Sequence, residues 1–122
     1  MTDLLSSGRY DQAFQKLQEL LKMQQEPVAI LGAVGGHFRR LSAARTLLDN
    51  GKTAYDLQKL CGIPDYPARK TMEAARRVSP HFCREAANLV LETDYRMKTS
   101  FDEPERLLEM LILQLAQEAR NA

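Results

Sequence analysis

Residues 27–49 read PVAILGAVGGHFRRLSAARTLLD, and this stretch decides the fold. Pro27 suits the first turn of a helix, and Asn50 followed by Gly51 is typical of a helix end. The predicted helix has about five to six turns at 3.6 residues per turn. Its apolar side chains recur at steps of three, four and seven residues and therefore share one stripe: Ile30, Val34, Phe38, Leu41 and Leu48.

The segments on either side follow the same period. Residues 10–21 place apolar side chains at three- and four-residue steps between glutamines and charged residues, which predicts an amphipathic helix. Further along, Thr53 and Asp56 form a capping-box pattern, and Gly62 marks the end of the short helix that they open. Each of these helices has one apolar face, as expected of helices that pack around a shared core.

Three more helix starts follow along the chain. Pro67 opens one helix, and Ser79 followed by Pro80 combines an N-cap with a proline in the first turn. Asp102, just before Pro104, is the predicted cap of the last helix, which covers residues 105–118. No segment alternates apolar and polar residues as a strand does. The sequence therefore predicts an all-α fold, a single bundle of about six helices in one domain of 122 residues.

The last helix is apolar around most of its circumference. A helix of this kind either lies in the centre of its own bundle or is covered by another subunit. We treat four of its residues as candidates for a subunit interface, with burial in the chain's own core as the alternative. They are Leu108, Met110, Ile112 and Leu113.

Composition excludes several classes of protein. Lysine and arginine number 17 against 16 for aspartate and glutamate, so the chain lacks the overall basic charge of many nucleic-acid binders, and any DNA contact must be local. No stretch approaches a membrane span, and the start lacks the pattern of a signal peptide. We therefore expect a cytoplasmic protein without membrane contact. In that compartment Cys61 and Cys83 are expected to be reduced packing residues.

A search for catalytic, cofactor or metal chemistry finds no competent motif. Gly32, Gly35 and Gly36 fall inside the long helix, away from the strand context of a phosphate loop, so close approach of a crossing helix is the preferred explanation. His37 and His81 are the only candidate bases, and neither stands in a nucleophilic motif. We expect no catalytic site, no cofactor and no metal in this chain.

The segment 52–78 has the outline of a helix-turn-helix. A short capped helix, a glycine turn and a second helix with four basic residues succeed one another. The second helix nevertheless begins with Asp65, Tyr66 and Pro67, whereas base reading favours long polar side chains at that place. A transcriptional regulator that binds duplex DNA as a dimer is therefore kept as the alternative function.

Short patterns follow one another in a characteristic order along nearly the whole chain: Glu26-Pro27, Leu31-Gly32, residues 37–41, Gly51-Lys52, residues 60–64, residues 68–70, residues 74–77 and residues 91–98. In this order and spacing they resemble the C-terminal region of the bacterial DNA polymerase III delta subunit. The resemblance lies in the ordered set, and no single motif is decisive. Gly35-Gly36 departs from the family pattern, which favours longer side chains before the aromatic residue.

The resemblance implies a collar domain of the replicative clamp loader. In such loaders the C-terminal helical domains of five subunits close a ring, and ATP handling and clamp opening belong to other regions. It therefore implies that residues 1–122 form a C-terminal helical domain from a longer chain, which is part of a DNA polymerase holoenzyme without being catalytic itself. The implied partners are the other loader subunits, bound through the collar, and the sliding clamp, contacted by a missing N-terminal part.

Aromatic residues at predicted turns suggest a contact with DNA, and the resemblance implies that this DNA is the primer-template, because the collar lies where the primer-template junction emerges. A ring beside a cation can stack on a base while the cation holds a phosphate. The alternative is that each ring packs over a helix end. The candidates for DNA contact are Tyr66, Arg69, Lys70, Lys98 and Phe101.

Overall fold

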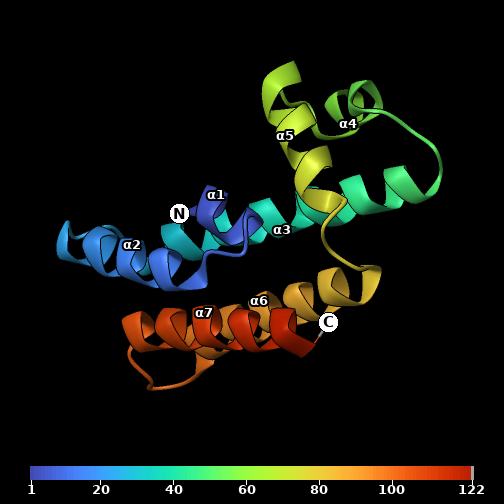
Figure 1. Ribbon diagram of the computed structural model, residues 1–122. Helices are drawn as coiled ribbons and strands as arrows, with labels where there is room; N and C mark the ends of the chain where they lie inside the picture. Colours follow the sequence, from blue (N-terminus) through green and yellow to red (C-terminus); the bar gives the residue numbers. More distant parts are fainter. Residues whose placement is uncertain (122) are drawn as a thin grey trace.

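The computed structural model describes residues 1–121, and within them it contains only α-helices (Figure 1). The all-α prediction is therefore confirmed. These described residues form seven helices where the sequence predicted about six: α1 Thr2–Ser6, α2 Tyr10–Lys22, α3 Pro27–Asp49, α4 Ala54–Cys61, α5 Asp65–Ala75, α6 Pro80–Thr99 and α7 Pro104–Asn121.

Most helix ends lie where the local sequence predicted them. Helix α3 starts at Pro27 and ends at Asp49. Thr53 and Asp56 form the expected capping box at the start of α4, and Gly62 ends that helix in the left-handed conformation with φ 66°. At the start of α6 the Ser79 hydroxyl accepts a hydrogen bond of 3.0 Å from the Phe82 N–H.

Two helix starts differ from the sequence-based expectation. Helix α5 begins at Asp65 and not at Pro67, because Pro64 has the extended backbone of an N-cap residue and Pro67 falls in the first turn, where no N–H is needed. Helix α1 was not predicted, since five residues are too few to display a helical period. Its Leu5 is only 3% exposed and joins the core.

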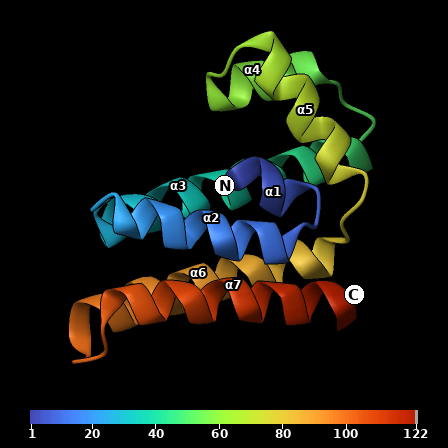
Figure 2. The same cartoon turned by 60° about the vertical axis from the view of Figure 1, so that its left-hand side comes forward.

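Helix α3 forms the centre of the molecule. It contacts α1, α4, α5, α6 and α7, whereas α2 packs on α1 and α7. Helices α6 and α7 run antiparallel along one side of α3, and the α4–α5 pair projects from its other side near its C-terminal end (Figures 1 and 2). The largest fully buried side chains come from α2, α3, α4 and α7: Leu17, Val34, Leu41, Leu57, Leu108, Leu111 and Leu115.

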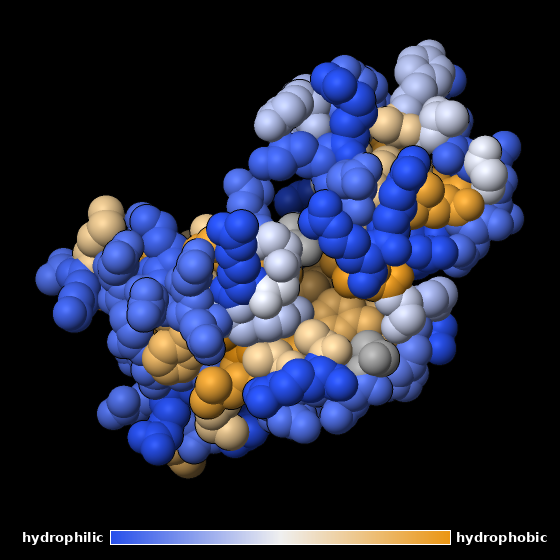
Figure 3. All heavy atoms as spheres, viewed as in Figure 1, coloured by the Kyte–Doolittle hydropathy of each residue, from blue (hydrophilic) through white to orange (hydrophobic). Residues whose placement is uncertain are grey.

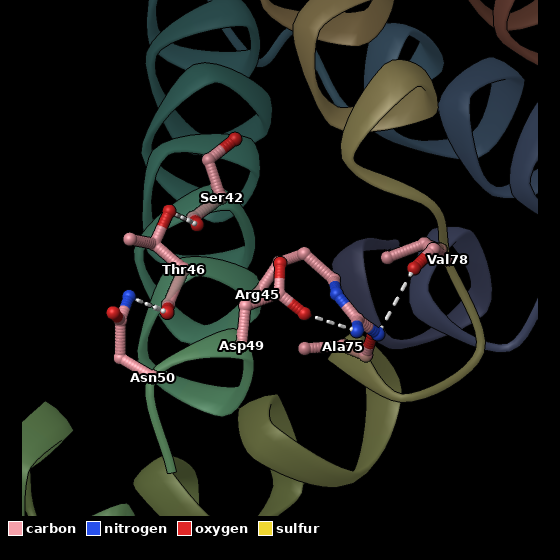
Figure 4. A network of polar contacts seen from close by, with 7 residues as sticks. All are labelled: Ser42, Arg45, Thr46, Asp49, Asn50, Ala75 and Val78. Carbon is pink, nitrogen blue, oxygen red and sulfur yellow. Dashed lines mark hydrogen bonds and ion pairs between the residues drawn. The ribbon is translucent and has the colours of Figure 1, made fainter. Parts of the chain in front are cut away.

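A single arginine of α3 fixes the end of α5. The Arg45 guanidinium donates hydrogen bonds to the carbonyl oxygens of Ala75, at 3.0 Å, and Val78, at 3.4 Å, and it forms an ion pair with Asp49 one turn along α3 (Figure 4). The last carbonyls of a helix lack partners within the helix and carry partial negative charge, so a cation stabilises them. Arg45 thereby holds the α4–α5 pair in one orientation on α3.

The glycines of α3 do not share one role. A Cβ at Gly35 would lie 3.2 Å from Val90 Cγ1 on α6, so this glycine permits the close helix approach that the sequence predicted. A Cβ at Gly32 would meet nothing within 4 Å, and one at Gly36 would meet only the ends of Arg39 and Arg40. The prediction therefore holds at Gly35 and does not explain Gly32.

Replacing these glycines by alanine tests that distinction. Gly32→Ala is expected to raise the free energy of unfolding by about 1 kcal/mol, because alanine is the better helix former and the added methyl group meets no neighbour. Gly35→Ala is expected to raise the free energy of unfolding by less, or to lower it, because the Val90 side chain must move to make room for the added methyl group. Urea unfolding of the two variants measures the difference, and an equal gain in both would contradict the close packing of α3 on α6.

Candidate functional site

The apolar side chains of α7 divide between the core and the surface. Five of them pack inside the chain, against helices that include α2 and α6. Gln18 of α2 donates a hydrogen bond to Glu109, which ties the two helices together at the edge of this contact. Met110 and Leu113 point outward, with 37% and 59% of their surface exposed.

The structure corrects half of the interface candidates on this helix. Leu108 and Ile112 are each 2% exposed, so their side chains fill the core of this chain and offer no surface to a partner. For these two residues the alternative explanation from the sequence, burial in the core of their own bundle, applies. Met110 and Leu113 stay predictions for an interface.

A second apolar surface was missed in the sequence. An open groove of about 490 Å³ runs between α3 and α6, and Gly32 and Gly35 form part of its wall. Val28 and Leu91 stand on this groove with 68% and 69% of their surface exposed. Single apolar residues outside a helical stripe are common on surfaces, so no sequence signal distinguishes this pair from ordinary exposed residues.

The five predicted DNA contacts fall into two separate groups. Tyr66, Arg69 and Lys70 lie on α5, whereas Lys98 lies in the last turn of α6 and Phe101 in the connection to α7. The α4–α5 pair and the α6–α7 connection are at opposite ends of the molecule in both ribbon views (Figures 1 and 2). One short DNA segment therefore cannot be held by both groups at a single point.

The cations in both groups already have acidic partners. Arg69 pairs with Asp65 at 3.0 Å, and Lys98 pairs with Asp94 at 2.9 Å, each one turn away on the same helix. These pairs are exposed, and such pairs contribute little stability, so a phosphate can displace the carboxylate. Phe101 is fully exposed and therefore does not pack over a helix end.

Lys70 has two neighbours of different character. Its Nζ lies 3.7 Å from the Asp3 carboxylate and 5.5 Å from the centroid of the Tyr66 ring. The same arrangement occurs on α4, where Lys59 Nζ lies 5.2 Å from the Tyr55 ring. The two tyrosines are equally exposed, at 63%. Tyr55 is therefore a matched control for any role of Tyr66.

The α4–α5 pair has the shape of a helix-turn-helix but not its chemistry. Asp65 begins the second helix, and its carboxylate accepts a hydrogen bond from Gln58 and pairs with Arg69. A carboxylate at the start of a recognition helix would face the phosphates and bases of DNA and repel the phosphates. This geometry does not favour reading of duplex DNA by α5.

His37 is a buried histidine near the centre of α3. Its side chain is 7% exposed and packs edge to face on Phe38, with 5.1 Å between the ring centroids. Burial, followed by the nearby charge of Arg40, lowers the pKa of His37 from 6.5 to about 4. The imidazole is therefore neutral at pH 7.

The other groups capable of chemistry are dispersed. His81 is exposed, Cys61 and Cys83 are free thiols, and burial raises the pKa of the Cys83 thiol. Residues 1–121 contain no group of three or more side chains able to hold a metal ion. None of the helices in this described part combines the length and apolar character needed to cross a membrane.

Comparison with known proteins connects this geometry to one family. Residues 1–115 match the model of the DNA polymerase III delta subunit, C-terminal domain. The DNA polymerase III subunit delta of Bacillus subtilis (strain 168) is 25% identical over 104 residues, which cover 85% of this chain and 30% of that protein. The Bacillus subtilis DNA clamp loader delta protein has the same fold, with a TM-score of 0.85, 22% identity and coverage of 95% of this chain and 34% of that one. The chain spans about a third of the length of both relatives.

The depressed pKa of His37 predicts a loss of stability in acid. Because the unfolded chain binds this proton near pH 6.5 and the folded chain only near pH 4, the contribution of neutral His37 is complete above pH 6.5 and is lost as the pH falls to about 4. The expected loss between pH 7 and pH 4.5 is on the order of 2 kcal/mol.

Urea unfolding at both pH values measures this loss. The difference in the free energy of unfolding between the two pH values is expected to shrink in His37→Gln. It is expected to persist in His81→Gln, which changes an exposed histidine. An unchanged difference in His37→Gln would show that the carboxylates alone cause the acid sensitivity.

Proposed function

The chain belongs to the family formed by the C-terminal domain of the DNA polymerase III delta subunit, and from this premise we propose that it is the collar domain that holds a delta subunit in the ring of a bacterial clamp loader. The family match over residues 1–115 carries the proposal. We infer that residues 1–122 act as one non-catalytic helical domain of that longer protein, with contact to the sliding clamp and any nucleotide handling assigned to other regions.

Exposed apolar side chains support an assembly role. Met110 and Leu113 lie on the outer face of α7, and Val28 and Leu91 line the α3–α6 groove. Burying an exposed leucine against a partner contributes about 1.5–3 kcal/mol, so a few such residues can stabilise an interface between subunits. The proposed partners are the other clamp-loader subunits, because the structural relative is itself named a clamp loader delta protein.

The helix-turn-helix regulator is not favoured. The family match covers the α4–α5 pair together with the rest of the bundle. The start of α5 also carries Asp65 where a recognition helix would approach DNA. We therefore assign the pair to helix packing on α3.

We extend the proposal to contact with primer-template DNA through exposed aromatic residues. Tyr66 and Phe101 are the two predicted aromatic contacts, and both are well exposed. Their positions at opposite ends of the molecule require two separate contacts, one on α5 and one at the α6–α7 connection.

Subunit assembly tests the collar role. In the full-length delta subunit mixed with the other loader subunits, Leu113→Glu and Leu91→Glu are each expected to weaken incorporation into the loader at least tenfold, because a buried carboxylate lacks a partner. Leu60→Glu is the control, since Leu60 is equally exposed, at 65%, but lies on α4. Gel filtration measures incorporation, and circular dichroism checks that each variant is helical. Incorporation at the control's level in both variants would refute the collar interface.

Binding of a labelled primer-template by the assembled loader tests the aromatic contacts. Tyr66→Ala and Phe101→Ala are each expected to weaken binding by about tenfold, the loss of one stacked base. Tyr55→Ala provides the control, because Tyr55 matches Tyr66 in exposure and in its lysine neighbour. Equal affinities in all four proteins, including the unchanged loader, would exclude these contacts.

A further inference from the structure

A basic cleft of about 590 Å³ opens between α1, α3 and α5. Four cationic side chains and the two carboxylates of Asp3 and Glu73 line the cleft, so its net charge is positive. The whole chain has a surplus of only one positive charge. The rest of the chain is therefore net negative. The cations come from separate segments: Arg9, Arg40, Lys70 and Arg77.

The cleft can be followed on the surface of the molecule. In Figure 3 strongly hydrophilic atoms surround a hollow between α1 and the α4–α5 pair, and apolar atoms lie mostly below it. Arg9 and Arg77 are exposed, and Arg40 is half-buried. Positive charge that is gathered in a concave surface attracts anions more strongly than the same charges spread over a flat face.

Three of these cations are available to a ligand. Among the described residues, no hydrogen bond or ion pair engages the side chains of Arg9, Arg40 or Arg77. Each guanidinium thus retains donors in the planar arrangement that binds phosphate with two parallel hydrogen bonds. Lys70 lies beside the Tyr66 ring and forms an exposed pair with Asp3, and an anion can replace that carboxylate.

Gly36 lies beside the end of the Arg40 side chain. A Cβ on this residue would lie 3.3 Å from Arg40 Nη1, closer than an ordinary van der Waals contact, so the guanidinium lies along α3 next to the glycine. The charge of Arg40 also reaches His37 on the same wall and contributes to the low pKa of that imidazole.

The edge of the cleft indicates which anion it takes. Tyr66 lines it with an exposed ring, beside Lys70 and Pro67. An aromatic ring next to cations suits a nucleotide, whose base stacks while its phosphate is held. An acidic peptide would use the cations but not the ring.

We propose that the cleft between α1, α3 and α5 binds a single-stranded nucleic acid, with Arg40 and Arg77 on its phosphates and Tyr66 against a base. The choice of nucleic acid as the ligand rests on the DNA contact under the proposed function. The site itself is defined by Arg40 and Arg77, which are not part of that contact. The chain binds the strand through its backbone and stacking, and therefore without strong sequence preference.

Fluorescence anisotropy with a labelled oligothymidylate of about ten nucleotides tests this site on the 122-residue chain. Arg40→Gln and Arg77→Gln are each expected to weaken binding about tenfold and to lower the slope of log K against log salt by about 0.7. The control is Arg106→Gln, which removes the same charge from an exposed position on α7 outside the cleft. Urea midpoints check that the variants are folded. If Arg40→Gln is unstable, Arg77→Gln alone still tests the site, because Arg77 is exposed and its replacement leaves the core unchanged.

Three outcomes would overturn the proposal. The first is that Arg106→Gln weakens oligonucleotide binding as much as the cleft variants do, which would indicate non-specific attraction. The second is tighter binding of polyglutamate than of the oligonucleotide, which would assign the cleft to an acidic protein segment. The third is binding of inorganic phosphate without binding of the strand. Loader assembly provides a separate readout. If the unsubstituted chain binds no oligonucleotide while the full-length subunit still assembles into the loader, the cleft proposal is rejected and the collar role is not.

Discussion

Helix α3 has to be buried on two sides at once, and the rest of the structure depends on that constraint. One side receives α6 and α7, and the other receives α4 and α5. A helix in this position needs apolar contacts around most of its circumference and must let its neighbours come close. Val34 and Phe38 meet the first need, since both are almost fully buried, and Gly35 meets the second where Val90 of α6 crosses it.

One polar contact of this helix adds to the apolar packing that orients the α4–α5 pair. Arg45 binds the carbonyls of Ala75 and Val78, so the C-terminal end of α5 is fixed to α3 at the point where the chain turns into α6. With that end fixed, α5 lies across α3 and faces α1, and the gap between them becomes the basic cleft. The cleft is thus a result of how α5 is held, and not of any single segment.

Local interactions explain which parts of the fold could be predicted from sequence. The caps at Thr53, Ser79 and Gly62 involve residues within a few positions of each other, and all three were predicted. The buried side of α7 could not be predicted, because Leu108 and Leu113 look alike in sequence and only the placement of neighbouring helices separates them. The cleft was missed for the same reason, since its arginines come from segments far apart in the chain.

The two sets of proposed DNA contacts differ in the cost of binding a phosphate. A phosphate at Lys98 or Arg69 must displace a carboxylate on the same helix, so the gain is reduced by the lost ion pair and by repulsion from the freed acid. Arg40 and Arg77 have no such competitor among the described residues. Sequence patterns find cations beside aromatic residues, but they do not show which cations are already paired. An arginine without an ion pair therefore has less to lose on binding a phosphate than a cation that must first release a carboxylate.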